Sequence, residues 1–541
     1  MTRPQTDAFP IRAMPLVSSG ARRARRGLAP LWWGLALLAA LLAAAAAFSR
    51  GVSGEGVAAS FGAADPGALD PALVAAPDAS AARAAPRQVA LALHRLQGGG
   101  GRALVSSGIP LPPGAVTADQ IAWVAVVVGD SQPAQRVRAL HTRHRDGSLR
   151  AVLVQFHAEL SGPRSVPARL VIGPRRAAAA LPGDAAAPGS PEAVALPTDP
   201  TYLVATDVVG PTRTVVETRL MGGAYARYEE DFRTFSEKLW ASEGPKWEGN
   251  YYDRALIYYA WWARTGDPLY WRRATESALT YRRDYLEANK ADPYKSSPHW
   301  AQLGGLAVHY QLTGDEGSRK AVVRVADILN GFNPSYMTRA IGESRIAARL
   351  VQSALLAWRL MPPGSPLPEG AERADWAQRL DRHLAAVFAW QLPDGSYPAD
   401  GQVCGGQLNY MVGMLDDALI QVYGEYRQDP RIVDAVRRAG DYMWRTQWRG
   451  DAQAFQYASV MCPKNEQGFG VGGPDPAPDL NGLIATTYAW LGARASDPAE
   501  RGTYRQRTDA VLAGGVAKAW LSGSKQFNEH YSASYRALGY R

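Results

Sequence analysis

The chain of 541 residues is poor in cysteine and lacks the motifs of several common enzyme classes. It has only two cysteines, Cys404 and Cys462, and no His/Cys cluster surrounds either one, which argues against a metal site. No Gly-x-Ser-x-Gly elbow and no P-loop sequence occurs, which excludes nucleophile-elbow hydrolases and P-loop enzymes. We therefore expect no metal and no other cofactor.

A basic surface is also lacking, although the formal net charge is +9. The first 50 residues hold seven Arg and one Asp, so +6 of this charge lies there and the remaining chain carries only +3. No basic stripe or nucleic-acid-binding motif appears in that remainder. A nucleic acid is therefore not expected as a partner.

One long apolar run stands near the N-terminus. Four arginines within residues 22–26 precede the run from Leu28 to Phe48, which is about 21 residues and long enough to span a bilayer. Basic residues that flank one end of a membrane-spanning segment hold that end in the cytoplasm. We expect a cytoplasmic segment at 1–27 and a single-pass anchor at 28–48 in the inner (cytoplasmic) membrane, with the main domains exported. The alternative is a cleaved signal peptide and a secreted protein.

Export would suit the two cysteines, because disulfides persist in oxidising compartments. Cys404 and Cys462 are expected either to pair or to remain two free thiols. Among the aromatic residues, 16 Trp and 24 Tyr outnumber 11 Phe. Trp and Tyr combine a flat apolar face with a polar edge, which suits contact with a sugar ring but also serves large helical cores.

Residues 49–86, rich in Ala, Gly, Pro and Asp, are expected to be a flexible linker. The region 87–220 is expected to be a β domain, a small barrel or sandwich, with an Ala/Pro-rich linker at 176–200 and further strands within 201–220. Short β-branched or apolar runs separated by turn residues predict the strands. These runs are Gln88 to Leu93, Trp123 to Val128, Arg136 to His141, Ala151 to Phe156 and Ala168 to Ile172.

Three segments of this region carry a resemblance. The runs 105–114 (VSSGIPLPPG), 135–138 (QRVR) and 145–154 (RDGSLRAVLV) resemble the N-terminal RIFT-barrel domain of the exo-rhamnogalacturonan lyase-like proteins. The resemblance covers under a fifth of the chain and implies a RIFT-like barrel. No catalytic residue of that family is matched in the rest of the chain.

From residue 221 to 541 helical stretches alternate between short turns and long loops. The short turns are similar to one another and lie at 263–268, 311–316, 426–430 and 493–498. Helical hairpins arranged in a ring would place these turns on one rim and the long loops on the other. This organisation resembles the (α/α) toroids of polysaccharide lyases and glycoside hydrolases, so we expect five or six helix pairs. An open solenoid is the structural alternative.

The long loops carry the candidate catalytic residues, because loops on one rim of a rigid scaffold are where binding and catalysis usually lie. Imidazole, phenol and amide groups would remove a proton, return it and neutralise a uronate, and two carboxylates would serve hydrolysis. The candidates are His299, Tyr410, Asn409, Glu248, Asp253 and Asp394. Asp416 and Asp417, inside a predicted helix, are further acids that would cost energy there unless they are paired.

Rings, amides and one arginine near these groups are expected to bind the substrate, since an arginine fork pairs well with a sugar carboxylate. These candidates are Trp247, Tyr252, Trp300, Arg345, Tyr397, Gln407, Tyr457 and Asn481.

Two chemistries remain open, together with a third role. A lyase acting by β-elimination on a uronate-containing polysaccharide would use His299, Tyr410, Asn409 and Arg345. A glycoside hydrolase would use Glu248 or Asp253 with Asp394 or Asp417. The third role is a non-catalytic protein that binds or assembles glycans. The expected partners are therefore a polysaccharide or oligosaccharide and, through the N-terminal helix, a membrane.

Overall fold

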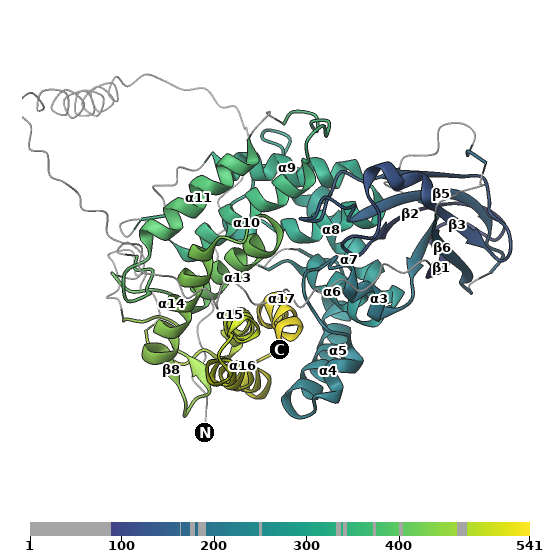
Figure 1. Cartoon of the computed structure of the whole chain (residues 1–541). Coiled ribbons are helices and arrows are strands. Elements are labelled where there is room, and N and C mark those ends of the chain that lie inside the picture. Colours follow the sequence, from purple (N-terminus) through teal and green to yellow (C-terminus); the bar gives the residue numbers. More distant parts are fainter. Residues whose placement is uncertain are drawn as a thin grey trace, which may run out of the picture. The chain divides into compact units, whose positions relative to one another are not determined.

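The structure, a computed structural model, describes residues 88–162, 164–173, 179–181, 191–247, 252–331, 337–338, 343–371, 375–399, 404–461 and 473–541. These residues run from a β-rich N-terminal region to a helical C-terminal part (Figure 1). Residues 68–541 form one compact unit. The second unit, 1–67, lies outside the described residues, as does the whole predicted linker 49–86.

The prediction of a membrane-spanning protein is wrong for the part of the chain that the structure describes. None of its helices is long and apolar enough to cross a bilayer. The run 28–48 that carried this prediction lies outside the described residues.

Seven strands form one sheet in the order β3-β6-β1-β7-β2-β5-β4. Their bounds are β1 Gln88–Arg95, β2 Arg102–Pro110, β3 Val124–Val128, β4 Gln135–Ala139, β5 Ala151–Glu159, β6 Val166–Ile172 and β7 Ala193–Pro197. The two edge strands are joined by one side chain. The Gln135 amide oxygen accepts from the Val126 N–H at 2.7 Å, and its nitrogen donates to the Val126 carbonyl at 3.0 Å. The bonds replace ladder bonds that an open edge would leave unmade.

The sequence correctly predicted a β-rich region here, but it missed two strands and predicted others where helices form. β2 was not among the predicted runs, and β7 lies within the predicted linker 176–200. The strands expected in 201–220 are instead two short helices, α3 Pro200–Ala205 and α4 Val215–Leu220. Their N-caps explain the difference: the Asp199 carboxylate accepts from Thr201 N–H, and Thr214 forms a capping box with Glu217.

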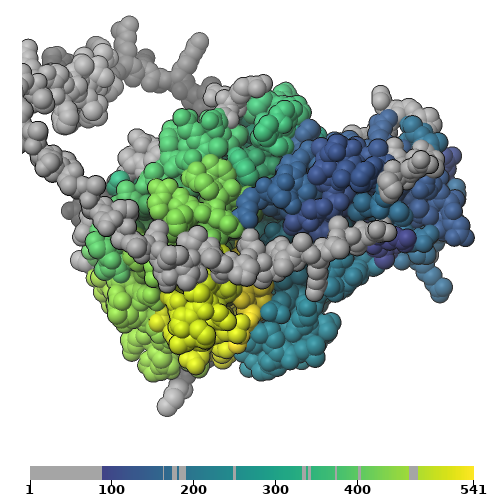
Figure 2. Space-filling model, viewed as in Figure 1, coloured from purple at the N-terminus to yellow at the C-terminus, as the bar shows by residue number. Residues whose placement is uncertain are grey.

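The helical part is a ring of paired helices. The inner helices are α6 Arg254–Thr265, α8 Leu303–Thr313, α10 Ser344–Leu360, α13 Asn409–Glu425, α15 Asn481–Arg494 and α17 Ser524–Tyr540. The outer helices are α5 Gly223–Glu243, α7 Pro268–Thr280, α9 Glu316–Asn330, α11 Trp376–Trp390, α14 Pro430–Gln447 and α16 Pro498–Lys518. Each inner helix contacts the next, and α17 contacts α6, which closes the ring. In Figure 2 the yellow C-terminal helices accordingly lie against the teal helices from the start of the ring.

The short turns have a common physical cause. α6 and α8 end at Gly266 and Gly314, whose φ values of 71° and 70° are left-handed and terminate the helix. The next residues, Asp267 and Asp315, cap α7 and α9 by accepting from backbone N–H groups. Asp429 and Asp497 cap α14 and α16 in the same way. The predicted turns are confirmed, and the inner helices all begin at the opposite, long-loop rim.

The β sheet packs on the short-turn rim. A Cβ added to Gly108 of β2 would lie 2.1 Å from the Gln311 carbonyl oxygen of α8, so only glycine permits this approach. Beside it, the Tyr310 hydroxyl accepts from the His141 N–H at 2.9 Å. The sheet therefore supports the ring at the rim opposite the long loops.

At the long-loop rim α6 and α8 are joined by Asp253, the N-cap of α6. Its two carboxylate oxygens accept from the Leu256 N–H at 3.0 Å and from the Gly305 N–H at 2.8 Å. A Cβ on Gly305 would lie 2.6 Å from Asp253 Oδ1 and 2.5 Å from the Ala255 Cβ. The start of α8 thus fits against α6 only without a side chain at this position.

We expect Gly305→Ala to lower the free energy of unfolding by about 1–3 kcal/mol, because its methyl group overpacks this contact. The matched control is Gly502→Ala on α16, where an added Cβ meets nothing within 4 Å. That change is expected to stabilise by roughly 0.4–1 kcal/mol. Urea unfolding of both variants measures the difference, and equal stabilities would contradict the described packing.

Candidate active site

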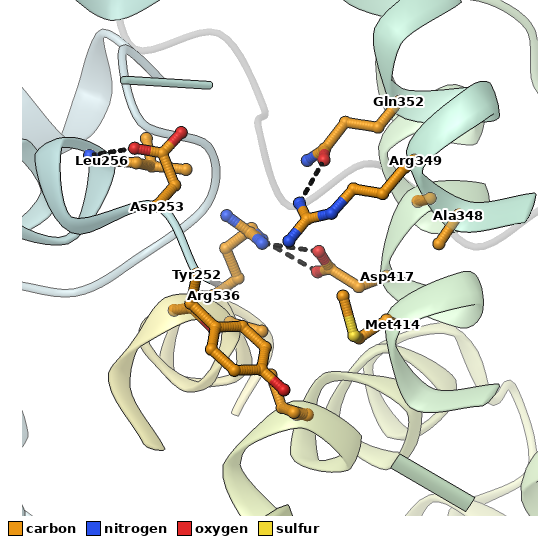
Figure 3. Close-up of a pocket in the computed structure, with 13 residues that line it drawn as sticks. Tyr252, Asp253, Leu256, Ala348, Arg349, Gln352, Met414, Asp417 and Arg536 are labelled. Atoms are coloured by element: carbon orange, nitrogen blue, oxygen red, sulfur yellow. Dashed lines mark hydrogen bonds and ion pairs between the residues drawn. The ribbon is translucent and has the colours of Figure 1, made fainter. Parts of the chain in front are cut away.

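Three inner helices direct columns of side chains into the ring. Residues three or four apart lie on one face of a helix, and this spacing relates Arg345, Arg349 and Gln352 on α10. The same spacing relates Tyr410, Met414 and Asp417 on α13, and Glu529, Ser532, Ala533 and Arg536 on α17. The residues of these columns that lie farther from the helix starts line a cavity of about 40 Å³, which Figure 3 shows between the helices. The first residue of each column lies near the start of its helix, on the long-loop rim.

Glu343, which immediately precedes α10, contacts an arginine and an imidazole at this rim. Its Oε1 accepts from Arg345 Nε at 2.9 Å and Nη2 at 2.7 Å, and lies 3.5 Å from His299 Nε2. Burial acts to raise the pKa of Glu343, but the hydrogen bond from His299 and the charge of Arg345 lower it overall. Its other oxygen, Oε2, is buried and has no hydrogen-bond partner among the described residues. That oxygen is available to accept from a bound hydroxyl.

The imidazole of His299 is oriented by two neighbours. Ser297 caps the short helix η3 Pro298–Trp300, and its hydroxyl lies 3.1 Å from His299 Nδ1. Nε2 faces Glu343, and the side chain remains 31% exposed. The geometry fixes the ring while leaving it accessible from the long-loop side.

Tyr410 begins the column on α13. Its hydroxyl lies 3.5 Å from the Tyr457 hydroxyl, and the two ring centroids are 5.4 Å apart. Burial, and then Tyr457, raise the pKa of Tyr410 well above 10, and Arg345 opposes them. The phenol is therefore protonated at neutral pH and suited to donate a proton.

Glu529, one turn above the cavity on α17, receives a hydrogen bond from Tyr252 and lies 3.4 Å from Lys525 Nζ. Its side chain is 6% exposed. Burial raises its pKa to about 7, although Lys525 and Tyr252 act against this. Glu529 is thus a carboxyl group that binds a proton close to neutral pH.

The structure places five predicted residues, His299, Arg345, Tyr410, Tyr457 and Tyr252, in this part of the molecule. Electrostatic coupling links the last four: Arg345 acts on Tyr410 and Tyr252, and Tyr457 acts on both of these tyrosines. Trp247 and Trp300 are half-buried near the same loops, and Trp247 stacks on Tyr285 with centroids 4.1 Å apart. Glu248 lies outside the described residues.

Three predicted amides are structural instead. Asn409 is fully buried; its nitrogen donates to the Gln456 carbonyl at 2.7 Å, and its oxygen accepts from Gln407. The Gln407 oxygen accepts from the Tyr397 N–H. Asn481 donates to the carbonyls of Gln453 and Val511. Their hydrogen-bonding groups hold the loops together, so the predictions of roles for them in catalysis or substrate binding are corrected.

The predicted carboxylates are also occupied, and one tyrosine is out of reach. Both oxygens of Asp253 accept from backbone N–H groups. Asp394 is exposed and caps its own turn, where Ser396 N and Oγ donate to it. Asp417 forms a bidentate ion pair with Arg536. Tyr397 is 0% exposed in the core, so it cannot contact a sugar.

Two further predictions concern groups outside the rim. Asp416 is fully buried, and burial raises its pKa well above the usual range; its Oδ2 accepts from the Thr487 hydroxyl at 2.9 Å. Cys404 is disulfide-bonded, and the predicted partner, Cys462, lies outside the described residues. No group of three His, Cys, Asp or Glu in the described ranges is arranged to hold a metal ion.

Sequence reasoning did not select Glu343, and it also missed Arg349 and Glu529. A signal for both existed. Inner helices are buried along their length, so a polar residue recurring every three or four positions in them must face a polar interior. Arg345, Arg349 and Gln352 show this spacing, and so do Glu529 and Arg536.

Solved structures similar to this chain include two structures of one hydrolase and one polysaccharide lyase. No protein family and no curated protein matches the chain. A variant of unsaturated glucuronyl hydrolase from Streptococcus agalactiae has 11% identity and a TM-score of 0.44, and covers 62% of this chain and 95% of its own. A second structure of that hydrolase has 11% identity and a TM-score of 0.40, with coverages of 55% and 82%. A polysaccharide lyase has 13% identity and a TM-score of 0.39, with coverages of 59% and 97%. Similarity at this level says nothing about the activity of this chain.

Glu529 gives a pH-dependent prediction. Its pKa rises from 4.5 to about 7 on folding, so it contributes stability that is present below pH 4.5 and is lost as pH rises through 7. The contribution is at most roughly 3 kcal/mol. We expect Glu529→Gln to flatten the dependence of unfolding free energy on pH between 4.5 and 8, measured by denaturant titration.

The control is Glu276→Gln on the exposed face of α7, which should leave the pH dependence unchanged. If the unfolding free energy of the Glu529→Gln variant depends on pH as it does in the unaltered protein, Glu529 is not held in a protonated state.

Proposed function

We propose that the protein cleaves an acidic polysaccharide by β-elimination at the long-loop rim of the ring. The observation that carries the proposal is the shared carboxylate of Glu343, which contacts both Arg345 and His299, while Arg345 also acts on the protonated phenol of Tyr410. A cation, a base and an acid are the three groups that this reaction requires.

Each group has a defined part in the reaction. Arg345 pairs with the uronate carboxylate and neutralises the charge that develops when the adjacent carbon loses its proton. His299 removes that proton. The electron pair left on the carbon forms the new carbon–carbon double bond, and the bond to the glycosidic oxygen breaks. Tyr410 donates its proton to that leaving oxygen, and the proton taken up by His299 then passes through water to the phenolate, which restores both groups.

The rim also suits an anionic substrate for a general reason. All the inner helices described above begin there, and helix N-termini carry partial positive charge from unpaired N–H groups. Arg345, Arg349 and Lys525 add full positive charges on the same side. These features support a uronate-containing glycan over a neutral one.

A glycoside hydrolase is the second candidate, favoured by one observation. The pKa of Glu529 is raised to about 7 and that of Glu343 is lowered, so one carboxyl is protonated where the other is ionised. Such divergence distinguishes a general acid from a base or nucleophile. The carboxylate pairs expected from the sequence do not support hydrolysis, because Asp253 and Asp417 are bonded to other groups.

Two expectations from the sequence remain part of the proposal. The sheet, whose two edge strands are joined by the Gln135 side chain, is consistent with a RIFT-like barrel. The disulfide at Cys404 supports an oxidising compartment, so we propose that the folded part is exported.

We expect Tyr410→Phe to lower kcat on an acidic polysaccharide by about 10²–10⁴-fold with little change in KM, because it removes the proton donor. The control is Tyr397→Phe, whose hydroxyl is buried without a partner and should be dispensable. Formation of unsaturated uronate, followed by its absorbance together with the release of reducing ends, measures the activity.

The same assay separates the three roles. Reducing ends without unsaturated product would replace the lyase by the hydrolase. Binding of the glycan with neither signal would leave a non-catalytic glycan-binding protein. Equal activity of Tyr410→Phe and Tyr397→Phe would exclude the proton-donor role of Tyr410.

A further inference from the structure

The outer helix α7 ends in an unusual turn. It continues into η2 Tyr281–Leu286, a π-helical turn in which the Glu287 N–H donates to the Arg282 carbonyl at 2.9 Å, five residues back. Such turns are rare and occur frequently at functional sites. Because α7 begins at the short-turn rim, η2 lies at the long-loop rim, directly before the loop that carries His299.

Tyr281, the first residue of η2, holds the backbone that follows His299. Its hydroxyl donates to the Trp300 carbonyl at 2.8 Å and accepts from the Gln302 N–H at 3.2 Å. Tyr281 is 2% exposed, so these hydrogen bonds are shielded from water. One side chain therefore joins η2 to two backbone groups within three residues of the imidazole.

Tyr285, one turn later in η2, contacts the backbone that precedes His299. Its hydroxyl lies 3.4 Å from Ser296 Oγ, which donates to the Ser297 carbonyl at 3.1 Å. Its ring is the one that stacks on Trp247. The π-helical turn thus contacts the loop on both sides of His299.

The short helix η3 needs such support from outside. It is a single turn of three residues, closed by the Trp300 N–H bond to the Ser297 carbonyl at 2.9 Å. A helix of this length is not stable by itself. A general base must also lie within hydrogen-bond reach of the proton that it removes, and a displacement of about 1 Å can cost 10²-fold in rate.

We propose that the π-helical turn η2 positions the imidazole of His299, with Tyr281 as the main positioning residue. The Tyr281 hydroxyl fixes the backbone after His299, so that Nε2 keeps its place beside Glu343. The inference depends on the proposed function, because it assumes that His299 is the base. It adds a residue of an outer helix that acts on the reaction only through His299.

A double-mutant cycle tests this dependence. Tyr281→Phe removes the hydroxyl and keeps the ring, and we expect it to lower kcat on an acidic polysaccharide by about 10–100-fold with little change in KM. In a His299→Ala background the same change should alter kcat by at most about twofold, because no imidazole remains to be positioned. Loss of the base costs about 10²–10⁴-fold, which leaves activity that long incubations can measure.

The matched control is Tyr488→Phe. Tyr488 of α15 is fully buried, and its hydroxyl also donates to a backbone carbonyl, that of Gly440 at 2.9 Å. The control loses a buried hydrogen bond of the same kind between α15 and α14, so it should lower the unfolding temperature similarly and leave kcat unchanged. An equal loss of kcat in Tyr281→Phe and Tyr488→Phe would assign Tyr281 to stability alone and overturn the proposal.

Hydrogen exchange tests the contact without requiring catalysis. In Tyr281→Phe the peptide that contains Gln302 should exchange about fivefold faster or more, and in Tyr488→Phe it should exchange as in the unaltered protein. Unchanged exchange in Tyr281→Phe would overturn the proposal. So would unchanged kcat, or a loss of kcat that is equally large with and without His299.

The outcomes separate this inference from the proposed function. If the polysaccharide is cleaved but the effects of Tyr281→Phe and His299→Ala are additive, the positioning role fails and the proposed activity remains. If no polysaccharide is cleaved, the proposed function fails, and hydrogen exchange still decides whether η2 holds the loop. Should thermal unfolding show that Tyr281→Phe does not fold, Tyr285→Phe, which removes the hydroxyl near Ser296, decides by the same cycle.

Discussion

The packing of the C-terminal helix against the beginning of the ring is the constraint on which the rest depends. α17 contacts α6, and Tyr531 donates to the Tyr228 carbonyl of α5 at 3.1 Å. Tyr535 donates to the Val209 carbonyl at 3.0 Å, which fixes α17 to the segment before α4. Tyr252, just before α6, and Glu529 of α17 both lie at the rim, although almost 280 residues separate them in the sequence. Without closure, the two halves of the site would not meet.

Closure also explains why charged residues occur inside the helical core. A lone buried charge costs several kcal/mol, whereas a bidentate pair satisfies both partners. Arg536 and Asp417 come from α17 and α13, and their bidentate pair forms only when the ring is complete. The pair contributes little net stability by comparison with apolar packing, but it disfavours any arrangement in which α17 lies elsewhere. Specificity for the closed ring is therefore the better account of its presence.

The sequence predicted the helical pairs and the rim better than it predicted the site. Helix turns are local events, and the Gly-Asp and Asp-Pro sequences that cause them can be read directly. The direction of a loop side chain is not local. Asn409 and Tyr410 are adjacent, yet Asn409 bonds the neighbouring loop while Tyr410 faces Arg345. Their side chains differ by about 100° around α13, and only the position of α13 in the ring decides which one faces inward.

The same reasoning separates Glu529 from Glu343, which the sequence presents as equivalent acids. Glu343 lies between Arg345 and His299, so its ionised form is favoured in spite of burial. Glu529 has Lys525, itself half-exposed, and burial prevails. The two carboxyl groups thus differ in protonation because of neighbours contributed by different helices. Of these two acids, Glu343 suits a reaction that needs a fixed anion to orient Arg345 and His299, and Glu529 suits one that needs a protonated carboxyl. The chemistry of the rim is consequently set by the order of the helices around the ring, and the sequence of any single loop does not determine it.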